Sequence, residues 1–112
     1  MLYPKQGDII ILDFNPQAGH EQAGKRPALV VSEYLFNKTT GFAAVCPITN
    51  QEKGYQFEVP LSGTQKITGL VLSDQFKSLD IQARGFKVVD SVDEEALRLI
   101  LRNISLVLGI KK

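Results

Sequence analysis

The sequence predicts a mainly β fold of the α+β class, a small antiparallel β-barrel or half-barrel with a packed C-terminal helix and one or two short helices. Six short runs rich in Val, Ile, Leu and Phe are separated by Gly, Pro or Asn, which is typical of strands and turns. Residues 91–109 change to a helical repeat. With 112 residues, 44% of them hydrophobic and 22% charged, the chain has the size and composition of one globular domain, residues 1–112.

The six predicted strands follow one another at residues 8–14, 27–32, 41–49, 55–61, 69–76 and 85–90. The runs at 8–14 and 27–32 are apolar without alternation, so we expect both of their faces to be covered. The run at 55–61 alternates, with Tyr55, Phe57, Val59 and Leu61 on one face. Its Glu58 and Pro60 indicate a strand at the edge of the sheet.

The C-terminal helix has recognisable start and stop signals. Ser91 and Glu94 have the spacing of a capping box, and Gly109 is a candidate C-cap. The helix carries more apolar surface than one core contact requires, which leaves some for a partner subunit. A shorter helix is predicted after Ser32, with Asn37 and Gly41 as stop signals.

Charge and cysteine usage exclude several classes of protein. The formal net charge of +1 gives no overall basic footprint, so any anion site must be built locally. The single Cys46 rules out an internal disulfide, suits a reducing cytosol and lies in an apolar run typical of the core. No run approaches the ~20 apolar residues of a membrane span, and residues 1–10 lack a signal-peptide layout, so we expect a cytoplasmic protein.

The strongest functional signal is the polar loop NPQAGHEQAGKRP at residues 15–27. A hairpin needs only about two to five loop residues, and long polar loops on small barrels often bind ligands. Pro27 restricts Arg26 to extended backbone, which places a guanidinium suited to phosphate at the mouth of the next strand. His20, the only histidine, fits acid–base chemistry but cannot build a multi-histidine metal site alone. Composition alone is equally compatible with a solvated loop.

Polar residues also interrupt or end the later strands. Thr49 ends the run 41–49, where its hydroxyl could act in a site or simply cap the following turn. Ser73, Asp74 and Gln75 cannot all face solvent within one strand, so at least one should point inward or into a cleft. A buried Asp74 would need a cationic or hydrogen-bonding partner, for which Arg26 is the natural candidate.

Four segments together resemble the MazF/PemK family of toxin endoribonucleases: PKQGDIIILDFNPQAGHEQAGKRPALVVS, CPIT, KGYQFEV and GLVLSDQFKSLD. The resemblance runs through nearly the whole chain. It implies an SH3-like barrel, a homodimer and a cognate antitoxin. It also implies cleavage of single-stranded RNA (mRNA) at specific sequences, without metal or other cofactor, by attack of the ribose 2′-OH to give 2′,3′-cyclic phosphate and 5′-OH ends.

Residue roles carried over by position are expectations of the resemblance. Arg26 and Thr49 form the expected catalytic pair, and the general base stays open between His20, Glu21 and Arg26. In one branch of the family a histidine and an aspartate matching His20 and Asp74 are catalytic, with an arginine where this chain has Leu72. Because Leu72 cannot replace that catalytic arginine, we assign its role to Arg26. The expected RNA contacts are Phe14, Asn15, Gln22, Lys25, Lys53, Ser73, Asp74 and Gln75.

Two of these expectations have competing interpretations. Phe14 and Phe76 could stack on bases, although a place in the barrel core is the commoner role for such residues. The related CcdB-type toxins share the barrel but act by binding DNA gyrase, which is the alternative function. Arg26 together with Thr49 behind a long loop favours RNA cleavage, because gyrase binding needs neither.

Overall fold

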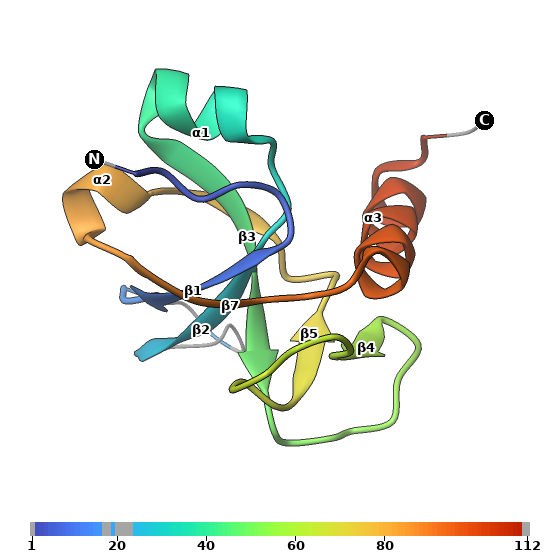
Figure 1. The fold of residues 1–112 in the computed structure, drawn as a ribbon. Helices are drawn as coiled ribbons and strands as arrows, with labels where there is room; N and C mark the ends of the chain where they lie inside the picture. Colours follow the sequence, from blue (N-terminus) through green and yellow to red (C-terminus); the bar gives the residue numbers. More distant parts are fainter. Residues whose placement is uncertain (1, 17–18, 20–23, 111–112) are drawn as a thin grey trace.

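An antiparallel sheet forms the body of the protein (Figure 1). The computed structural model describes residues 2–16, 19 and 24–110. The strands are β1 (Asp8–Asp13), β2 (Lys25–Val30), β3 (Phe42–Thr49), β4 (Glu58–Pro60), β5 (Leu70–Leu72), β6 (Lys77–Asp80) and β7 (Lys87–Ser91). The helices are α1 (Tyr34–Thr40), α2 (Ile81–Arg84) and α3 (Glu94–Leu108). The predicted mainly β, antiparallel fold with a C-terminal helix and short additional helices is confirmed.

The central strand β3 changes its partner along one edge. Its residues 42–45 pair with β6, whereas residues 48 and 49 pair with β5, and its other edge pairs with β2. Among the described residues, the strands follow the order β4-β5-β3-β2-β1-β7, and the path does not close on itself. The single strand predicted at 69–76 is therefore wrong. Residues 73–76 form a turn, closed by a hydrogen bond from the Gln75 N–H to the Leu72 carbonyl, and β6 follows it.

Both faces of β1 and β2 are buried, as their unbroken apolar runs predict. Ile9 and Leu29 belong to one core, which Ile100 of α3 completes. Ile10 and Leu12 belong to a second core on the opposite side, which includes Ile81 of α2. β4 lies at one end of the sheet, which confirms the edge position predicted for Glu58 and Pro60.

The core position predicted for Cys46 is confirmed, since it is fully buried. Burial, with a smaller contribution from Asp74, raises the pKa of the Cys46 thiol to about 12. The thiol is therefore protonated at neutral pH and packs as a small apolar group.

Helix α3 begins two residues later than the predicted capping box. Its N-cap is Asp93, whose Oδ1 accepts from the Ala96 N–H at 2.9 Å, while Ser91 is the last residue of β7. The predicted C-cap is confirmed, because Gly109 has φ +73° and its N–H bonds the Leu106 and Ser105 carbonyls. Along α3, the buried side chains are those of the first half, and the C-terminal end leaves Leu106, Val107, Leu108 and Ile110 exposed.

Helix α1 confirms the short helix predicted after Ser32, and Gly41 ends it with φ +76°. The stop role predicted for Asn37 is wrong. Asn37 is fully buried inside the helix, where its Nδ2 donates to the Pro4 carbonyl at 2.9 Å and ties α1 to the N-terminal segment. Within the described ranges, no helix is long and apolar enough to cross a membrane.

Candidate active site

The structure places the Arg26 side chain against the end of β3, although 22 residues separate Arg26 from the Ile48 carbonyl that it contacts. Arg26 is the second residue of β2, and its Nη1 donates to the Ile48 carbonyl at 3.3 Å, one residue before Thr49 at the end of β3. The guanidinium is partly buried. The hydrogen bond to the Ile48 carbonyl holds the side chain against the end of β3, and a guanidinium carries five N–H donors in a planar arrangement suited to phosphate.

The Thr49 hydroxyl caps the turn that follows β3 and remains able to donate. Its Oγ1 accepts from the Gln51 N–H at 3.1 Å, which uses an acceptor site and leaves the O–H proton. The capping role and the site role considered for Thr49 are therefore compatible. Thr49 also borders a polar cavity of about 30 Å³, lined in addition by Gln51, Lys53, Tyr55, Glu58, Leu72 and Gln75.

A carboxylate holds the loop between β3 and β4 in shape. The Glu58 side chain accepts from the N–H groups of Lys53 and Gly54 at 3.0 and 2.9 Å. Gly54 has φ +81°, a conformation that favours glycine. The exposed side chain of Lys53 is thereby presented at the cavity beside Thr49.

In the segment Ser73–Asp74–Gln75, the buried member is Ser73 rather than Asp74. The Ser73 hydroxyl donates to the Phe57 carbonyl at 2.6 Å and accepts from Asn103 of α3 at 3.1 Å, so Ser73 is not exposed to a ligand. Asp74 is exposed, and its Oδ1 accepts from the Tyr55 hydroxyl at 2.7 Å. The expectation that Asp74 is buried and needs Arg26 as its partner is wrong.

The two phenylalanines considered for base stacking pack in the cores instead. Phe14 is 1% exposed and belongs to the core on the α2 side, which rules out stacking on a base. Phe76 is partly buried against the core on the α3 side. Both follow the commoner role of aromatic residues at strand ends.

The base of the long loop is fixed from both of its ends. The Asn15 side chain accepts from the Gly24 N–H at 3.1 Å, and the Phe14 N–H donates to the Gly24 carbonyl at 3.0 Å. Arg84 of α2 donates to the carbonyls of Asp13 and Asn15 at 2.8 and 2.6 Å. This role of Arg84 could not be predicted from the sequence, because no local pattern links Arg84 to carbonyls about seventy residues away.

The remaining predicted residues divide into two groups. Lys25 is exposed at the start of β2, beside Arg26, and Gln75 is partly buried at the cavity. His20, Glu21 and Gln22 lie outside the described residues, so their roles stay predictions.

Comparison with known proteins agrees with this geometry along almost the whole chain. Residues 5–108 match the sequence profile of the PemK-like, MazF-like toxins of type II toxin–antitoxin systems. The endoribonuclease toxin MazF of Escherichia coli K12 is 45% identical over 106 residues, 95% of each chain. The endoribonuclease PemK of Escherichia coli is 36% identical and covers 93% of this chain and 81% of its own.

Solved structures give the same result. The crystal structure of MazF (Form-I) from Deinococcus radiodurans superposes with a TM-score of 0.90 at 39% identity, covering 96% of this chain and 97% of its own. A MazE–MazF crystal structure (Form-II) from the same organism matches with a TM-score of 0.85 at 32% identity, covering 97% and 98%. This chain belongs to the PemK-like, MazF-like family of type II toxin–antitoxin toxins.

Proposed function

We propose that this protein is an endoribonuclease toxin that cleaves single-stranded mRNA at specific sequences without a metal ion. The observation that carries the proposal is the Arg26 guanidinium, which donates to the Ile48 carbonyl, one residue before Thr49 at the end of β3. The relatives named endoribonucleases support it, since they match nearly the full length of the chain. The site of action would be the cytoplasm, where mRNA is translated.

The proposed reaction is an internal transesterification. The ribose 2′-oxygen forms a bond to the adjacent phosphorus, the bond from phosphorus to the 5′-oxygen breaks, and a 2′,3′-cyclic phosphate and a 5′-OH end result. A base accepts the 2′-OH proton and an acid protonates the leaving 5′-oxygen. Arg26 supplies charged donors to the non-bridging oxygens, and Thr49 adds a neutral hydroxyl donor.

The proton acceptor is proposed to lie in the loop between β1 and β2. An arginine has a pKa above about 12 and is a poor acceptor, so Glu21 or His20 is the chemically easier choice. Exposed Lys25 and Lys53 would neutralise flanking phosphates, and the further contacts are proposed for Asn15, Gln22 and Gln75.

The first test is cleavage of a long unstructured RNA in EDTA, with end-group analysis. We expect discrete cuts that carry cyclic phosphate, and a loss of at least about a hundredfold in rate for Arg26→Ala. Lys38→Ala, which removes an exposed charge on α1, is the matched control and should cleave normally. Absence of cutting by the unmodified protein would refute the proposed function. Cutting that survives Arg26→Ala would refute only the role of Arg26.

Two substitutions of Thr49 separate its hydroxyl from its shape. Thr49→Val keeps the branched side chain but removes the donor, and should slow cleavage by about a hundredfold. Thr49→Ser keeps the hydroxyl and should retain most of the activity. Equal rates for the two variants would exclude the hydroxyl from the reaction.

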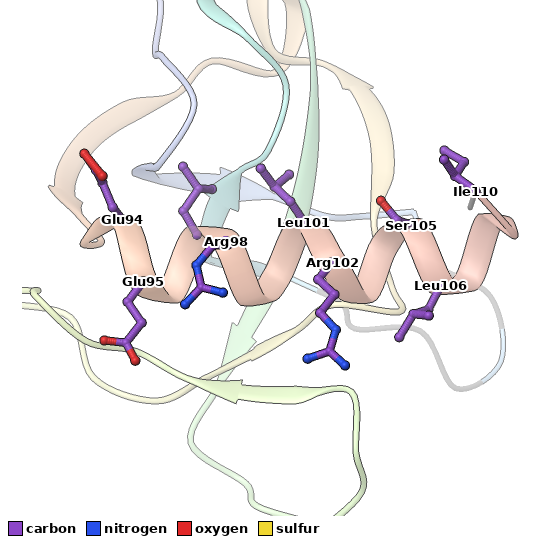
Figure 2. A pocket seen from close by; sticks show the side chains of 9 residues that line it. Glu94, Glu95, Arg98, Leu101, Arg102, Ser105, Leu106 and Ile110 are labelled. Atoms are coloured by element: carbon purple, nitrogen blue, oxygen red, sulfur yellow. The ribbon is translucent and has the colours of Figure 1, made fainter. Parts of the chain in front are cut away.

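We further propose that the active form is a homodimer joined along α3. A groove of about 790 Å³ runs along this helix, and Figure 2 shows Glu95, Arg98, Arg102 and Leu106 projecting to the same side. Acidic residues occupy the N-terminal end of the groove, arginines its middle and apolar side chains its C-terminal end. A twofold axis that packs two such helices antiparallel brings Glu95 of each copy opposite Arg102 of the other.

Light scattering after gel filtration tests the dimer. Arg102→Glu should weaken the dimer by placing like charges together, and the double variant Glu95→Arg with Arg102→Glu should restore it. An unmodified protein with the mass of one chain at micromolar concentration would refute the proposal. So would a charge reversal that leaves the dimer unchanged.

The cognate antitoxin is proposed to act on the same face as RNA. An acidic and apolar segment would compete with RNA phosphates for Lys25, Arg26 and Lys53. The MazE–MazF crystal structures of the similar Deinococcus protein support a partner of this class.

A further inference from the structure

A tyrosine with no role in the proposed reaction lies at the wall of the Thr49 cavity. The Tyr55 hydroxyl donates to Oδ1 of Asp74 at 2.7 Å, and its side chain lines the cavity together with Thr49, Lys53 and Gln75. Tyr55 comes from the loop between β3 and β4, whereas Asp74 comes from the turn between β5 and β6. The pair therefore bridges the two loops that border the candidate active site.

Contacts with neighbouring residues hold both Tyr55 and Asp74 in place. The Glu58 N–H donates to the Tyr55 carbonyl at 3.1 Å, and the Tyr55 ring contacts the Phe57 ring with centroids 6.5 Å apart. Asp74 follows Ser73, which is anchored to the Phe57 carbonyl and to Asn103 of α3. The pair is thus a preorganised surface on a rigid support.

The hydrogen bond between Tyr55 and Asp74 contributes little to the stability of the fold. Asp74 is exposed, and an exposed polar pair contributes little to folding because water competes for both groups. Partial desolvation and the neighbouring Asp74 raise the pKa of Tyr55 to about 12, so its hydroxyl is a proton donor over the whole working range of pH.

The chemistry of the pair suits one kind of ligand group. With Oδ1 of Asp74 occupied by Tyr55, Oδ2 accepts no hydrogen bond from any described residue and remains available to an outside donor. Carboxylates in nucleic-acid interfaces accept from exocyclic amino groups, and aromatic rings stack on bases. Adenine, cytosine and guanine carry such an amino group, whereas uracil does not.

We propose that Tyr55 and Asp74 select a base with an exocyclic amino group next to the cleaved phosphate, and reject uracil there. This inference rests on the proposed RNA cleavage and adds a determinant of its sequence preference. Asp74 accepts from the amino group, while Tyr55 fixes the carboxylate and offers its ring to the base. Neither residue takes part in proton transfer at the cleaved bond.

The test uses a short RNA that contains one mapped cleavage site. Each base flanking the cut is replaced in turn by its analogue without the amino group: purine riboside for adenosine, inosine for guanosine and zebularine for cytidine. For the unmodified protein, removal of the amino group at one flanking position should lower kcat/KM on the order of ten- to a hundredfold. Asp74→Ala should cleave the parent RNA and the analogue at similar rates.

Two further variants test whether discrimination depends on the Asp74 carboxylate itself. Tyr55→Phe retains the ring and should reduce discrimination only partly, because the carboxylate remains. Glu52→Gln removes an exposed carboxylate from the same loop and should leave the discrimination unchanged. Circular dichroism of each variant monitors folding.

The outcomes distinguish this inference from the proposed function. If the unmodified protein cuts no RNA, both are overturned. If it cuts RNA and Asp74→Ala discriminates the analogue as strongly as before, only this inference is overturned. A cut site flanked by uracil on both sides overturns it as well, and so does an equal loss of cleavage on every substrate for Asp74→Ala, which would indicate catalysis instead of recognition.

Discussion

Asp90→Asn tests whether a carboxylate holds the loop that leads into β5. Asp90, near the end of β7, accepts from the backbone N–H groups of Gln65, Lys66, Ile67 and Ser91 at 2.6–3.1 Å. Partial desolvation raises the pKa of Asp90, but these four donors outweigh it and lower the pKa to about 2. An asparagine has nearly the same size and shape as Asp90 but carries no charge. It also places an N–H₂ group, which is a donor, against the backbone N–H donors.

The magnitude follows from the linkage between protonation and folding. A pKa of 3.8 in the unfolded chain against about 2 in the folded one corresponds to at most about 2.5 kcal/mol at pH 7. Because water reaches this carboxylate, we expect only about 1 kcal/mol, or about 4 °C in Tm. The folded pKa is the lower one, so the contribution is complete above about pH 5 and is lost as the pH falls toward 2, with about half remaining at pH 3.

Urea unfolding followed by circular dichroism at pH 7, 4 and 3 measures this contribution. The difference between the unmodified protein and Asp90→Asn should be largest at pH 7 and about halved at pH 3. Glu52→Gln, the exposed control, should show no such difference at any of these values. A free energy of unfolding that differs equally at pH 7 and pH 3 would show that the charge of Asp90 is not responsible.

Two backbone features near the site give the remaining predictions. Gly69→Ala places a Cβ 2.6 Å from the Thr49 carbonyl at φ +130°, so we expect a loss of about 2 kcal/mol in unfolding experiments and slower RNA cleavage. Gly54→Ala, where a Cβ meets nothing within 4 Å, should cost less and serves as the control. Arg84→Gln releases the two carbonyls at the base of the long loop, so unfolding should become about 1–2 kcal/mol easier and amide exchange near Gly24 faster.

Most of the fold could be predicted because hydrophobic period and turn residues are local signals. The unbroken apolar runs of β1 and β2 correctly indicated two buried faces, and Gly41 and Gly109 correctly marked helix ends. Asn37 misled because a buried hydrogen bond to the Pro4 carbonyl outweighed its usual preference for helix ends. The split between β5 and β6 depends on β3 changing its partner, which the residues 69–76 do not reveal.

The site could be predicted in part from residue type. Arg26 and Thr49 stand out by chemistry and position, and the structure places the Arg26 guanidinium at the Ile48 carbonyl, one residue before Thr49. The bond between Tyr55 and Asp74 could not be foreseen, since it joins residues 19 apart in sequence from two different loops. For Phe14 the sequence left base stacking and the core open, and packing against the core on the α2 side decides for the core.

The distribution of charge is compatible with the proposed contact with RNA, although the formal net charge of the chain is only +1. Several acids bond to the backbone, where they shape loops: Glu58 holds the loop after β3, Asp90 the loop before β5, and Asp93 the start of α3. Backbone N–H dipoles partly neutralise these carboxylates. The side chains of Lys25 and Lys53 are exposed next to the candidate catalytic pair. The acids thus support the loops, and Lys25 and Lys53 stay exposed for the proposed contact with phosphate, which depends on this local arrangement and not on the overall charge.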